Sequence, residues 1–348
     1  MRSVTRKLAL SSAAAVASLA AVAATVGPAS ADPPVGTTPA ASDIVSVGSD
    51  TIQAFDNGLS AAYNATSPTS KYYSWDATPA GNITPKSGAS TIARPNGSGA
   101  GITALNGNTH STVDVARSSR GPQTGSDDWF IAFATDAVGW SAYTGGHAPS
   151  NLTSAELKGI YNCTYTTWNS LPSNPTASTA TIKVYLPQAS SGTRSFFLSA
   201  LGITATTEPC WQTATPEENE GTDAAFTSNP DAIFPYSLSH YVGQVYKSKG
   251  GGNDLPGSLD AQRSLDGTAQ ILTASQDWNS SLSLTYSRNV YHVVRQADWS
   301  DATEGPRLKA LFDRSSANGW LCKSSGTLIT DYGFHSLGAG CGTRTGGK

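Results

Sequence analysis

The chain has 348 residues, of which 38% are hydrophobic and 14% charged, enough for one large or two medium domains with proper cores. Its formal net charge is -3, and a net acidic chain is a poor binder of nucleic acid, so that class of function is excluded. After the first 31 residues no stretch reaches about 18 apolar residues, so we expect no membrane span.

Residues 1–31 are typical of a secretory signal peptide. Arg2, Arg6 and Lys7 precede an Ala/Leu/Val run that ends in the sequence ASA, an A-x-A-like cleavage site before Asp32. The basic region has no twin-arginine pair, and no lipobox cysteine lies near the cleavage point. We therefore expect Sec export without an acyl anchor, and a secreted, extracellular protein.

The first ordered elements are expected soon after the leader. Residues 32–42 are rich in Pro, Thr and Ala and predict a flexible lead-in. Residues 43–49 alternate apolar and small polar side chains and predict a strand. Residues 50–63 then place apolar side chains at helical spacing, so a strand, a turn and a helix open the fold.

Strands and helices continue to alternate along the chain. The patterns predict strands at 111–119, 129–143 and 181–188, helices at 153–162 and 193–202, and a loop at 247–258. The alternation indicates an α/β fold with parallel or mixed sheets. The length favours two domains.

Four cysteines follow the leader, and an oxidising exterior favours pairing them. Three connectivities are open, and closeness in sequence favours Cys163 with Cys210 and Cys322 with Cys341. The alternative is a zinc site. Because the sequence has no C-x-x-C spacing, we expect disulfides and no metal.

Three predicted strands are followed by turns of one chemical kind. The turns are GSDT at 48–51, NGSGAG at 96–101 and SSGT at 190–193. Each offers backbone N–H groups and a hydroxyl just before a predicted helix, and this arrangement suits an oxyanion. The alternative for each turn alone is an ordinary helix cap or loop.

Other chemistries have no matching motif. The NGSGAG turn is not a dinucleotide fingerprint, no P-loop occurs, and neither Ser98 nor Ser191 lies in G-x-S-x-G. The five histidines are scattered without metal or base motifs. The acid pair Glu217 and Glu218 is predicted to lie in a solvated loop. We therefore expect neither an enzyme nor a cofactor.

In this order the motifs resemble those of a known family, the phosphate-type (PstS-like) substrate-binding proteins of ABC importers, in their exported actinobacterial branch. The resemblance covers nearly the whole chain after the leader. Its landmarks are VGSDT, NGSGAGITAL, VDVARSS, FIAFATDAVGWSAY, LTSAELKGIYNCTYTTWNSL, SSGTRSFF, NEGTDAAF with DAIFPYSLSHYV, and SRNVYHVV.

The resemblance implies a two-lobed, periplasmic-binding-protein-like (type II) fold. Two α/β domains would be joined by two crossing strands, with the ligand held in the cleft between them. Lobe 1 would comprise residues 43–135 plus 288–348, and lobe 2 residues 136–287. The favoured disulfides would then fall one in each lobe.

The resemblance also implies the ligand, inorganic phosphate or a similar tetrahedral oxyanion. This chain departs from the family at two positions, because Ser119 stands where many members have an aspartate and Pro187 where they have an arginine. Arg120 and Arg194 are our preferred sources of a replacement guanidinium over Arg94 and Arg117, with Asp50 as the proton acceptor. The full set of expected ligand residues is Asp50, Thr51, Ser98, Ser119, Arg120, Ser191, Gly192, Thr193 and Arg194.

The leading hypothesis is thus a monomeric, secreted solute-binding protein. Because no acyl anchor is expected, scavenging, signalling and retention in the wall are as open as delivery of the ligand to an ABC permease. One alternative keeps the fold but binds an organic phosphate or a sugar by stacking on tryptophans. A second is a secreted hydrolase or phosphatase. The tryptophans in question are Trp75, Trp129, Trp140 and Trp168.

Overall fold

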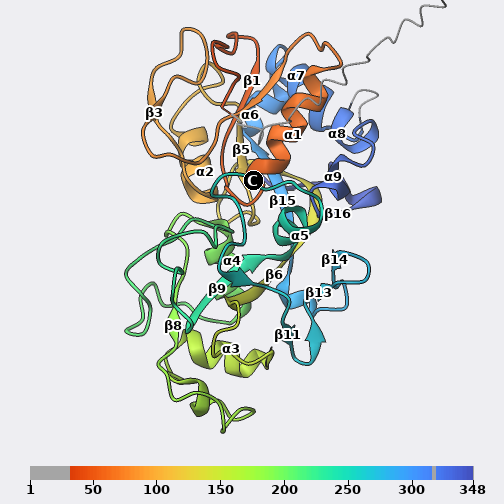
Figure 1. Ribbon diagram of the computed structural model, residues 1–348. Coiled ribbons are helices and arrows are strands. Elements are labelled where there is room, and N and C mark those ends of the chain that lie inside the picture. The colour runs from red at the N-terminus through yellow and green to blue at the C-terminus, as the bar shows by residue number, and fades with distance from the viewer. Residues whose placement is uncertain (1–31, 316–318, 348) are drawn as a thin grey trace, which may run out of the picture.

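A computed structural model describes residues 32–315 and 319–347. The predicted signal peptide, residues 1–31, lies outside the described residues. The chain forms two parts, one above the other in Figure 1. Lobe 1 is the part that holds β1, α1 and α2, and lobe 2 is the part that holds β8, β9 and α3.

Lobe 1 is built on parallel strands. β1 (Ile44–Gly48) pairs in parallel with β2 (Tyr72–Ser74) on one side and β5 (Val115–Ser118) on the other. Helix α1 (Gln53–Asn64) follows β1, and α2 (Ser98–Asn106) precedes β5. The predicted opening of strand, turn and helix is therefore present, and it directs the turn after β1 toward lobe 2.

Two neighbouring strands lie where the lobes join, and the longer of them pairs with strands of both lobes. β6 (Trp129–Tyr143) and β15 (Ser287–Val294) are antiparallel, with Ala137 paired to Ser287 at one end and Trp129 to Val294 at the other. Beyond that ladder β6 pairs with β9 (Ala232–Ser237), which belongs to lobe 2. One sheet, in the order β2-β1-β5-β15-β6-β9-β8, therefore joins the two lobes.

Lobe 2 places three helices around β9 and the short β8 (Lys183–Val184). They are α3 (Ser154–Tyr161), α4 (Gly192–Ala200) and α5 (Leu238–Tyr246). α3 begins with a capping box, in which the Thr153 side chain accepts from the Glu156 N–H and the Glu156 carboxylate accepts from the Thr153 N–H. The predicted helix start at this position is confirmed.

The remaining elements are short. The strands are β3 (Asn82–Ile83), β4 (Ile92–Ala93), β7 (Asn151–Leu152), β10 (Leu259–Asp260), β11 (Ser264–Leu265), β12 (Thr268–Ala269), β13 (Ile271–Leu272), β14 (Asp277–Trp278), β16 (His335–Ser336) and β17 (Arg344–Gly346). The helices are α6 (Gln296–Ser300), α7 (Glu304–Phe312), α8 (Trp320–Lys323) and α9 (Leu328–Asp331). None of the helices in 32–315 and 319–347 is long and apolar enough to cross a bilayer.

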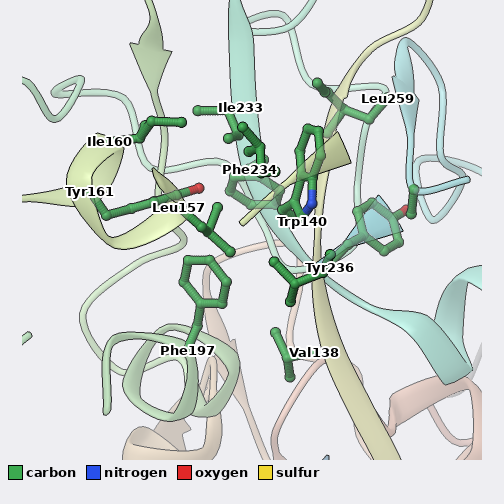
Figure 2. Close-up of a cluster of buried hydrophobic side chains, with 14 of the residues drawn as sticks. Val138, Trp140, Leu157, Ile160, Tyr161, Phe197, Ile233, Phe234, Tyr236 and Leu259 are labelled. Carbon is green, nitrogen blue, oxygen red and sulfur yellow. The ribbon is translucent and has the colours of Figure 1, made fainter. Parts of the chain in front are cut away.

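Each lobe has its own hydrophobic core. The lobe 2 core lies within residues 137–286, and the lobe 1 clusters lie within 44–134 and 290–341. Figure 2 shows the lobe 2 core, where Trp140 of β6 lies among side chains that include Leu157 of α3 and Phe197 of α4. Truncating a side chain of this size to alanine costs about 3–5 kcal/mol, so Trp140 is a major contributor to the stability of lobe 2.

Burial also decides a question about the tryptophans. Trp140 and Trp168 are completely buried in the lobe 2 core. The Trp140 indole N–H donates to the Ser264 carbonyl at 3.1 Å, and that of Trp168 to Asp231 at 2.8 Å. The hypothesis that they stack on a sugar or an organic phosphate is therefore wrong for these two, because neither ring has a free face.

The two favoured disulfides are confirmed. Cys163 is bonded to Cys210, 47 positions away, and Cys322 to Cys341, 19 positions away. The first pair lies beside the lobe 2 core and the second beside the lobe 1 core. Each lobe therefore has one covalent crosslink.

Two segments differ from the sequence-based expectation. The strand expected over 181–188 has only two paired residues, because the chain turns after Pro187 toward α4. Residues 32–42 form no helix or strand, but the Asp32 carboxylate accepts two hydrogen bonds from the Arg94 guanidinium, at 2.6 and 2.8 Å. The start of the lead-in therefore contacts lobe 1.

Candidate oxyanion site between the lobes

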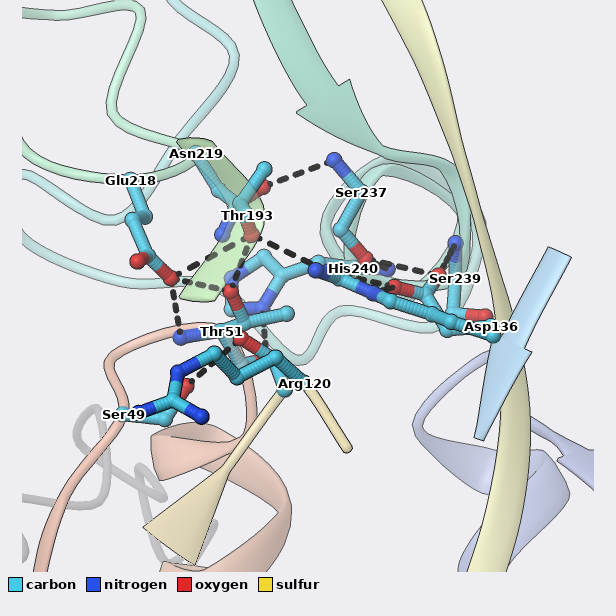
Figure 3. Close-up of polar contacts among 12 residues, drawn as sticks. Ser49, Thr51, Arg120, Asp136, Thr193, Glu218, Asn219, Ser237, Ser239 and His240 are labelled. Atoms are coloured by element: carbon cyan, nitrogen blue, oxygen red, sulfur yellow. Dashed lines mark hydrogen bonds and ion pairs between the residues drawn. The ribbon is translucent and has the colours of Figure 1, made fainter. Parts of the chain in front are cut away.

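The three glycine and hydroxyl turns, predicted separately, lie together where the lobes meet. Thr51 of the first turn and Thr193 of the third have their Oγ1 atoms 2.8 Å apart, and they come from different lobes (Figure 3). Gly99 of the second turn donates its N–H to the Ser190 carbonyl of the third at 2.9 Å. Strand order and short turns therefore place all three at one interface.

Each of these turns leads into a helix of nine or more residues, α1, α2 or α4. Ser191 is the N-cap of α4, and its Oγ accepts from the Arg194 N–H at 2.9 Å. Gly97, the N-cap of α2, has φ of 92°, and an added Cβ would lie 2.6 Å from the Ser190 carbonyl oxygen. The positive ends of three helix dipoles therefore face one small region, which favours negative charge there.

Three serine hydroxyls form the lobe 1 wall of this region. Ser98 Oγ accepts from the Ser119 N–H at 3.0 Å, and Ser119 Oγ lies 3.2 Å from both Ser98 Oγ and Ser49 Oγ. All three serines are completely buried. Gly192, the first residue of α4, packs against Ser98 and Ser119. The serine at position 119 thus joins a hydroxyl cluster where the resemblance implies an aspartate in relatives.

A carboxylate accepts the hydrogen bonds of the donors at the centre of the site. Glu218 Oε2 accepts from the Thr51 N–H at 3.2 Å, from the Thr51 hydroxyl, and from the Thr193 hydroxyl at 3.4 Å (Figure 3). Glu218 is completely buried, so its prediction as part of a solvated loop is wrong. Its side chain turns away from solvent because these inward-facing donors stabilise the carboxylate.

The cation at this site comes from a crossing strand. Arg288 of β15 pairs with Asp136 of β6 through Nε at 3.0 Å and Nη2 at 2.8 Å, and Nη2 also donates to Thr193 Oγ1 at 3.0 Å. Arg288 Nη1 is buried and has no hydrogen-bond partner among the described residues. Sequence reasoning missed Arg288, although an aspartate in one crossing strand and an arginine in the other are a signal for such a pair.

The two preferred arginines, Arg120 and Arg194, donate to backbone carbonyls. Arg120 donates Nη1 to the carbonyl of its neighbour Gly121 at 3.1 Å. Arg194 donates to the carbonyls of Pro187 at 2.9 Å and Thr206 at 3.2 Å. Both guanidinium groups therefore donate to backbone carbonyls of their own lobe.

The other two arginines are also occupied. Arg94 pairs with Asp32, and the completely buried Arg117 donates to the Ser49 carbonyl at 3.0 Å and to Ser74 Oγ at 2.7 Å. Arg117 therefore acts indirectly, because it holds the backbone of the first turn in place.

Asp50 lies in the first turn, and its environment is acidic. Burial, followed by the carboxylates of Asp254 and Glu218, raises its pKa well above the usual aspartate value. Its Oδ2 is buried without a hydrogen-bond partner among the described residues. Burial and neighbouring carboxylates therefore disfavour ionisation of Asp50, and its role as proton acceptor stays a prediction.

His240 adds a positive charge beneath the same turn. Its Nδ1 lies 2.9 Å from the Thr51 carbonyl oxygen and its Nε2 lies 2.5 Å from Asp254 Oδ1. Burial lowers the pKa of His240, but the Asp254 carboxylate more than offsets this, and the pKa rises to about 9. The protonated ring donates from both nitrogens, so His240 of lobe 2 holds the Thr51 turn of lobe 1.

The fold is shared with solved structures from distant organisms. An ABC-type phosphate transport receptor from Vibrio cholerae is 20% identical, with a TM-score of 0.55 over 85% of this chain and 100% of that one. A phosphate-binding protein from Stenotrophomonas maltophilia is 13% identical, with a TM-score of 0.54 over 85% and 90%. A human phosphate-binding apolipoprotein is 13% identical, with a TM-score of 0.51 over 86% and 92%.

No curated protein sequence matches the chain. The family model described as a PBP superfamily domain, however, matches residues 35–304, which include β1, all three turns, both crossing strands and every residue of the candidate site. The family match and the observed two-lobed α/β fold point to the same superfamily. The chain therefore belongs to the periplasmic-binding-protein (PBP) superfamily.

Proposed function

We propose that this protein is a secreted solute-binding protein that captures phosphate or a similar tetrahedral oxyanion between its lobes. One observation supports this above the others. Hydroxyl and N–H donors from both lobes, at Thr51 and Thr193, already converge on a carboxylate oxygen. Buried donors that bind the oxygen of a carboxylate can also bind an oxygen of an external oxyanion placed at the same position.

The proposed ligand set follows from the same contacts. The backbone and hydroxyl donors are those of the three turns, and Arg288 supplies the guanidinium through Nη1, which has no hydrogen-bond partner within residues 32–315 and 319–347. Arg120 and Arg194 are left out, because their guanidinium groups bind backbone carbonyls. The proposed ligand residues are Asp50, Thr51, Ser98, Ser119, Ser191, Gly192, Thr193 and Arg288.

In this set, the negative charge of the ligand is balanced mainly by helix dipoles and backbone N–H groups. Arg288 is paired with Asp136, and His240 with Asp254, so neither is a free cation. Three helix starts and the N–H groups of the turns therefore supply most of the positive potential, as they do at other phosphate sites on helix N-termini.

The names of the structural neighbours support phosphate as the ligand and transport as the context. One is named a phosphate transport receptor and two are named phosphate-binding. We propose accordingly that this protein delivers its ligand to an ABC permease, acts as a monomer, and has its lobes at residues 43–135 with 288–348 and at 136–287. The predicted signal peptide supports a secreted location.

A binding role is also favoured over an enzyme by the contacts of the hydroxyls. Ser98 and Ser119 bond each other, and Thr51 bonds Thr193 and Glu218. His240 contacts the Thr51 carbonyl, which is not a nucleophile. In the described part of the chain, no hydroxyl of this cluster makes a hydrogen bond to a histidine, which is the commonest base for an activated hydroxyl.

Calorimetric titration of residues 32–348 with phosphate, arsenate and sulfate tests the proposal. Heat of binding with at least one of these anions is expected, and Thr193→Val is expected to weaken it by about tenfold or more, because it removes a buried donor. Thr124→Val, at an exposed loop position, is the matched control and should bind as the unaltered chain does. Absence of binding with all three anions would contradict the proposal.

A further inference from the structure

Glu218 is held in the site by a hydrogen-bonded backbone segment of lobe 2. The next residue, Asn219, has φ of 62°, and its Oδ1 accepts from the Ser237 N–H at 3.0 Å. The Asn219 carbonyl accepts from Gln244 Nε2 at 2.9 Å and from the Tyr236 hydroxyl. Asn219 is completely buried, so these contacts fix the backbone on one side of Glu218 and direct its side chain toward lobe 1.

The residue before Glu218 also contacts lobe 1. Both Glu217 carboxylate oxygens accept from Asn96 Nδ2, at 2.8 and 3.0 Å. Asn96 belongs to the second turn, and Thr51, which donates to Glu218, belongs to the first. Two consecutive glutamates of lobe 2 are therefore bound to the turns of lobe 1.

The contacts of Glu218 use donors that a ligand would need. Arg288 Nη2 donates to Thr193 Oγ1, so the hydroxyl hydrogen of Thr193 is free to point to Thr51 or to Glu218. The Thr51 N–H and hydroxyl both point to Glu218 Oε2. Because one hydrogen serves one strong acceptor at a time, an oxyanion gains these donors only when the carboxylate leaves.

The carboxylate is also incompletely satisfied where it lies. Glu218 Oε1 is buried and has no hydrogen-bond partner among the described residues, and Arg288 Nη1 is in the same state. A buried polar atom without a partner costs free energy. A tetrahedral anion offers four oxygens instead of two, so it can take the donors of Glu218 and reach further groups at the same time.

We propose that Glu218 is a specificity-determining residue that acts as an internal competitor. Its carboxylate occupies the oxyanion position and bonds the lobes together in the absence of ligand, and an incoming anion must displace it. Tetrahedral oxyanions with several acceptor oxygens win this exchange, and simple carboxylates do not. This inference rests on the proposed function, because it assumes that the same donors bind the external ligand.

Glu218→Gln tests the competition, since the amide keeps the shape of the side chain and removes its charge. Calorimetric titration with phosphate is expected to show binding at least about tenfold tighter than in the unaltered chain, the size expected from losing hydrogen bonds to a charged acceptor. Acetate, as a plain carboxylate probe, should bind to Glu218→Gln and not to the unaltered chain. Glu208→Gln, at a glutamate of lobe 2 outside the candidate site, is the matched control and should stay within about twofold for phosphate.

Equal or weaker phosphate binding by Glu218→Gln would overturn this inference and leave the proposed function intact. Phosphate binding seen only in Glu218→Gln would show that Glu218 blocks the donors, and it would contradict phosphate capture by the unaltered chain. If neither protein binds any oxyanion, the proposed function fails, and the inference fails with it.

Small-angle scattering without ligand gives a second, independent measurement. Glu218→Ala removes the bonds to Thr51 and Thr193, so its radius of gyration should exceed that of the unaltered chain. An identical radius of gyration would overturn the statement that Glu218 bonds the lobes together. Circular dichroism of the variant checks that each lobe remains folded.

Discussion

Gly192 of lobe 2 lies directly against the Ser98 side chain of lobe 1, with no room for a methyl group between them. An added Cβ would overlap Ser98 Oγ and Ser119 Oγ. Because Gly192 is also the first residue of α4, the start of this helix can approach the hydroxyls of the opposite lobe only without a side chain. The closeness of the lobes thus depends on a single missing carbon atom.

Gly192→Ala is expected to weaken oxyanion binding by at least about tenfold, because the methyl group holds α4 away from the lobe 1 donors. The free energy of unfolding should change little, since the clash lies between lobes and not within a core. Calorimetry and urea unfolding measure the two effects. Gly121→Ala is the control, as its nearest atom would be Tyr291 OH at 3.7 Å, an ordinary contact. Unchanged affinity in Gly192→Ala would show that the lobes do not close this tightly around the ligand.

Arg288→Met is expected to lower the free energy of unfolding by about 3–5 kcal/mol, because it leaves the Asp136 carboxylate buried without its cation. Urea unfolding monitored by fluorescence measures the change. The double variant Arg288→Met, Asp136→Asn should recover at least half of the loss, since it removes the orphaned charge while the amide oxygen still accepts from Ser237 Oγ and the Ser239 N–H. If the double variant is no more stable than the single one, the cost does not come from an unpaired charge.

The local parts of the fold could be predicted from the sequence. β6 covers the predicted residues 129–143, and α1 and α4 begin close to their predicted starts, because apolar periodicity and hydroxyl caps are short-range signals. The three turns could be predicted for the same reason. Their meeting at one place depends on strand order, which the family resemblance supplied and local patterns did not.

The charged groups of the site could not be predicted in the same way. Arg288 is 95 positions from Thr193 in sequence, and Glu218 is 167 positions from Thr51, so no local pattern links them. Proximity in sequence to the turns pointed instead to Arg120 and Arg194, whose side chains fold back on nearby carbonyls. A charged residue in each of the two crossing strands, Asp136 and Arg288, is a stronger signal for a buried ion pair.

His240 makes the stability of the closed chain depend on pH. Its pKa rises from 6.5 to about 9 in the fold, so its contribution is fully present below about pH 6.5 and is lost as pH rises through about 9. We expect a loss of about 3 kcal/mol over this range. Urea unfolding at several pH values measures it, and His240→Gln should flatten the dependence. His147→Gln, a half-exposed histidine, is the control. A pH dependence that persists unchanged in His240→Gln would contradict the assignment.

Removing the disulfides should affect the lobes unequally. The loop closed by Cys163 and Cys210 is longer than that closed by Cys322 and Cys341, 47 positions against 19. Chain entropy alone predicts a loss of about 4 kcal/mol for the first pair and about 3 kcal/mol for the second when both cysteines of a pair become alanine. Denaturant unfolding of the two double variants checks this order. A larger loss for the shorter loop would mean that folded-state contacts, and not loop length, decide the effect.

The two connections between the lobes are strands of one sheet, β6 and β15, hydrogen-bonded to each other from Trp129 with Val294 to Ala137 with Ser287. Neither connection is a flexible loop. A rotation of one lobe on the other must twist both strands together, and their shared hydrogen bonds resist any sliding. The ladder shifts its register between Val290 and Tyr291, next to Ala134 and Ala132 of β6, which gives the ribbon one place where it is already kinked. We therefore expect the lobes to open and close by bending of the paired β6 and β15 strands, with the bend near this register shift.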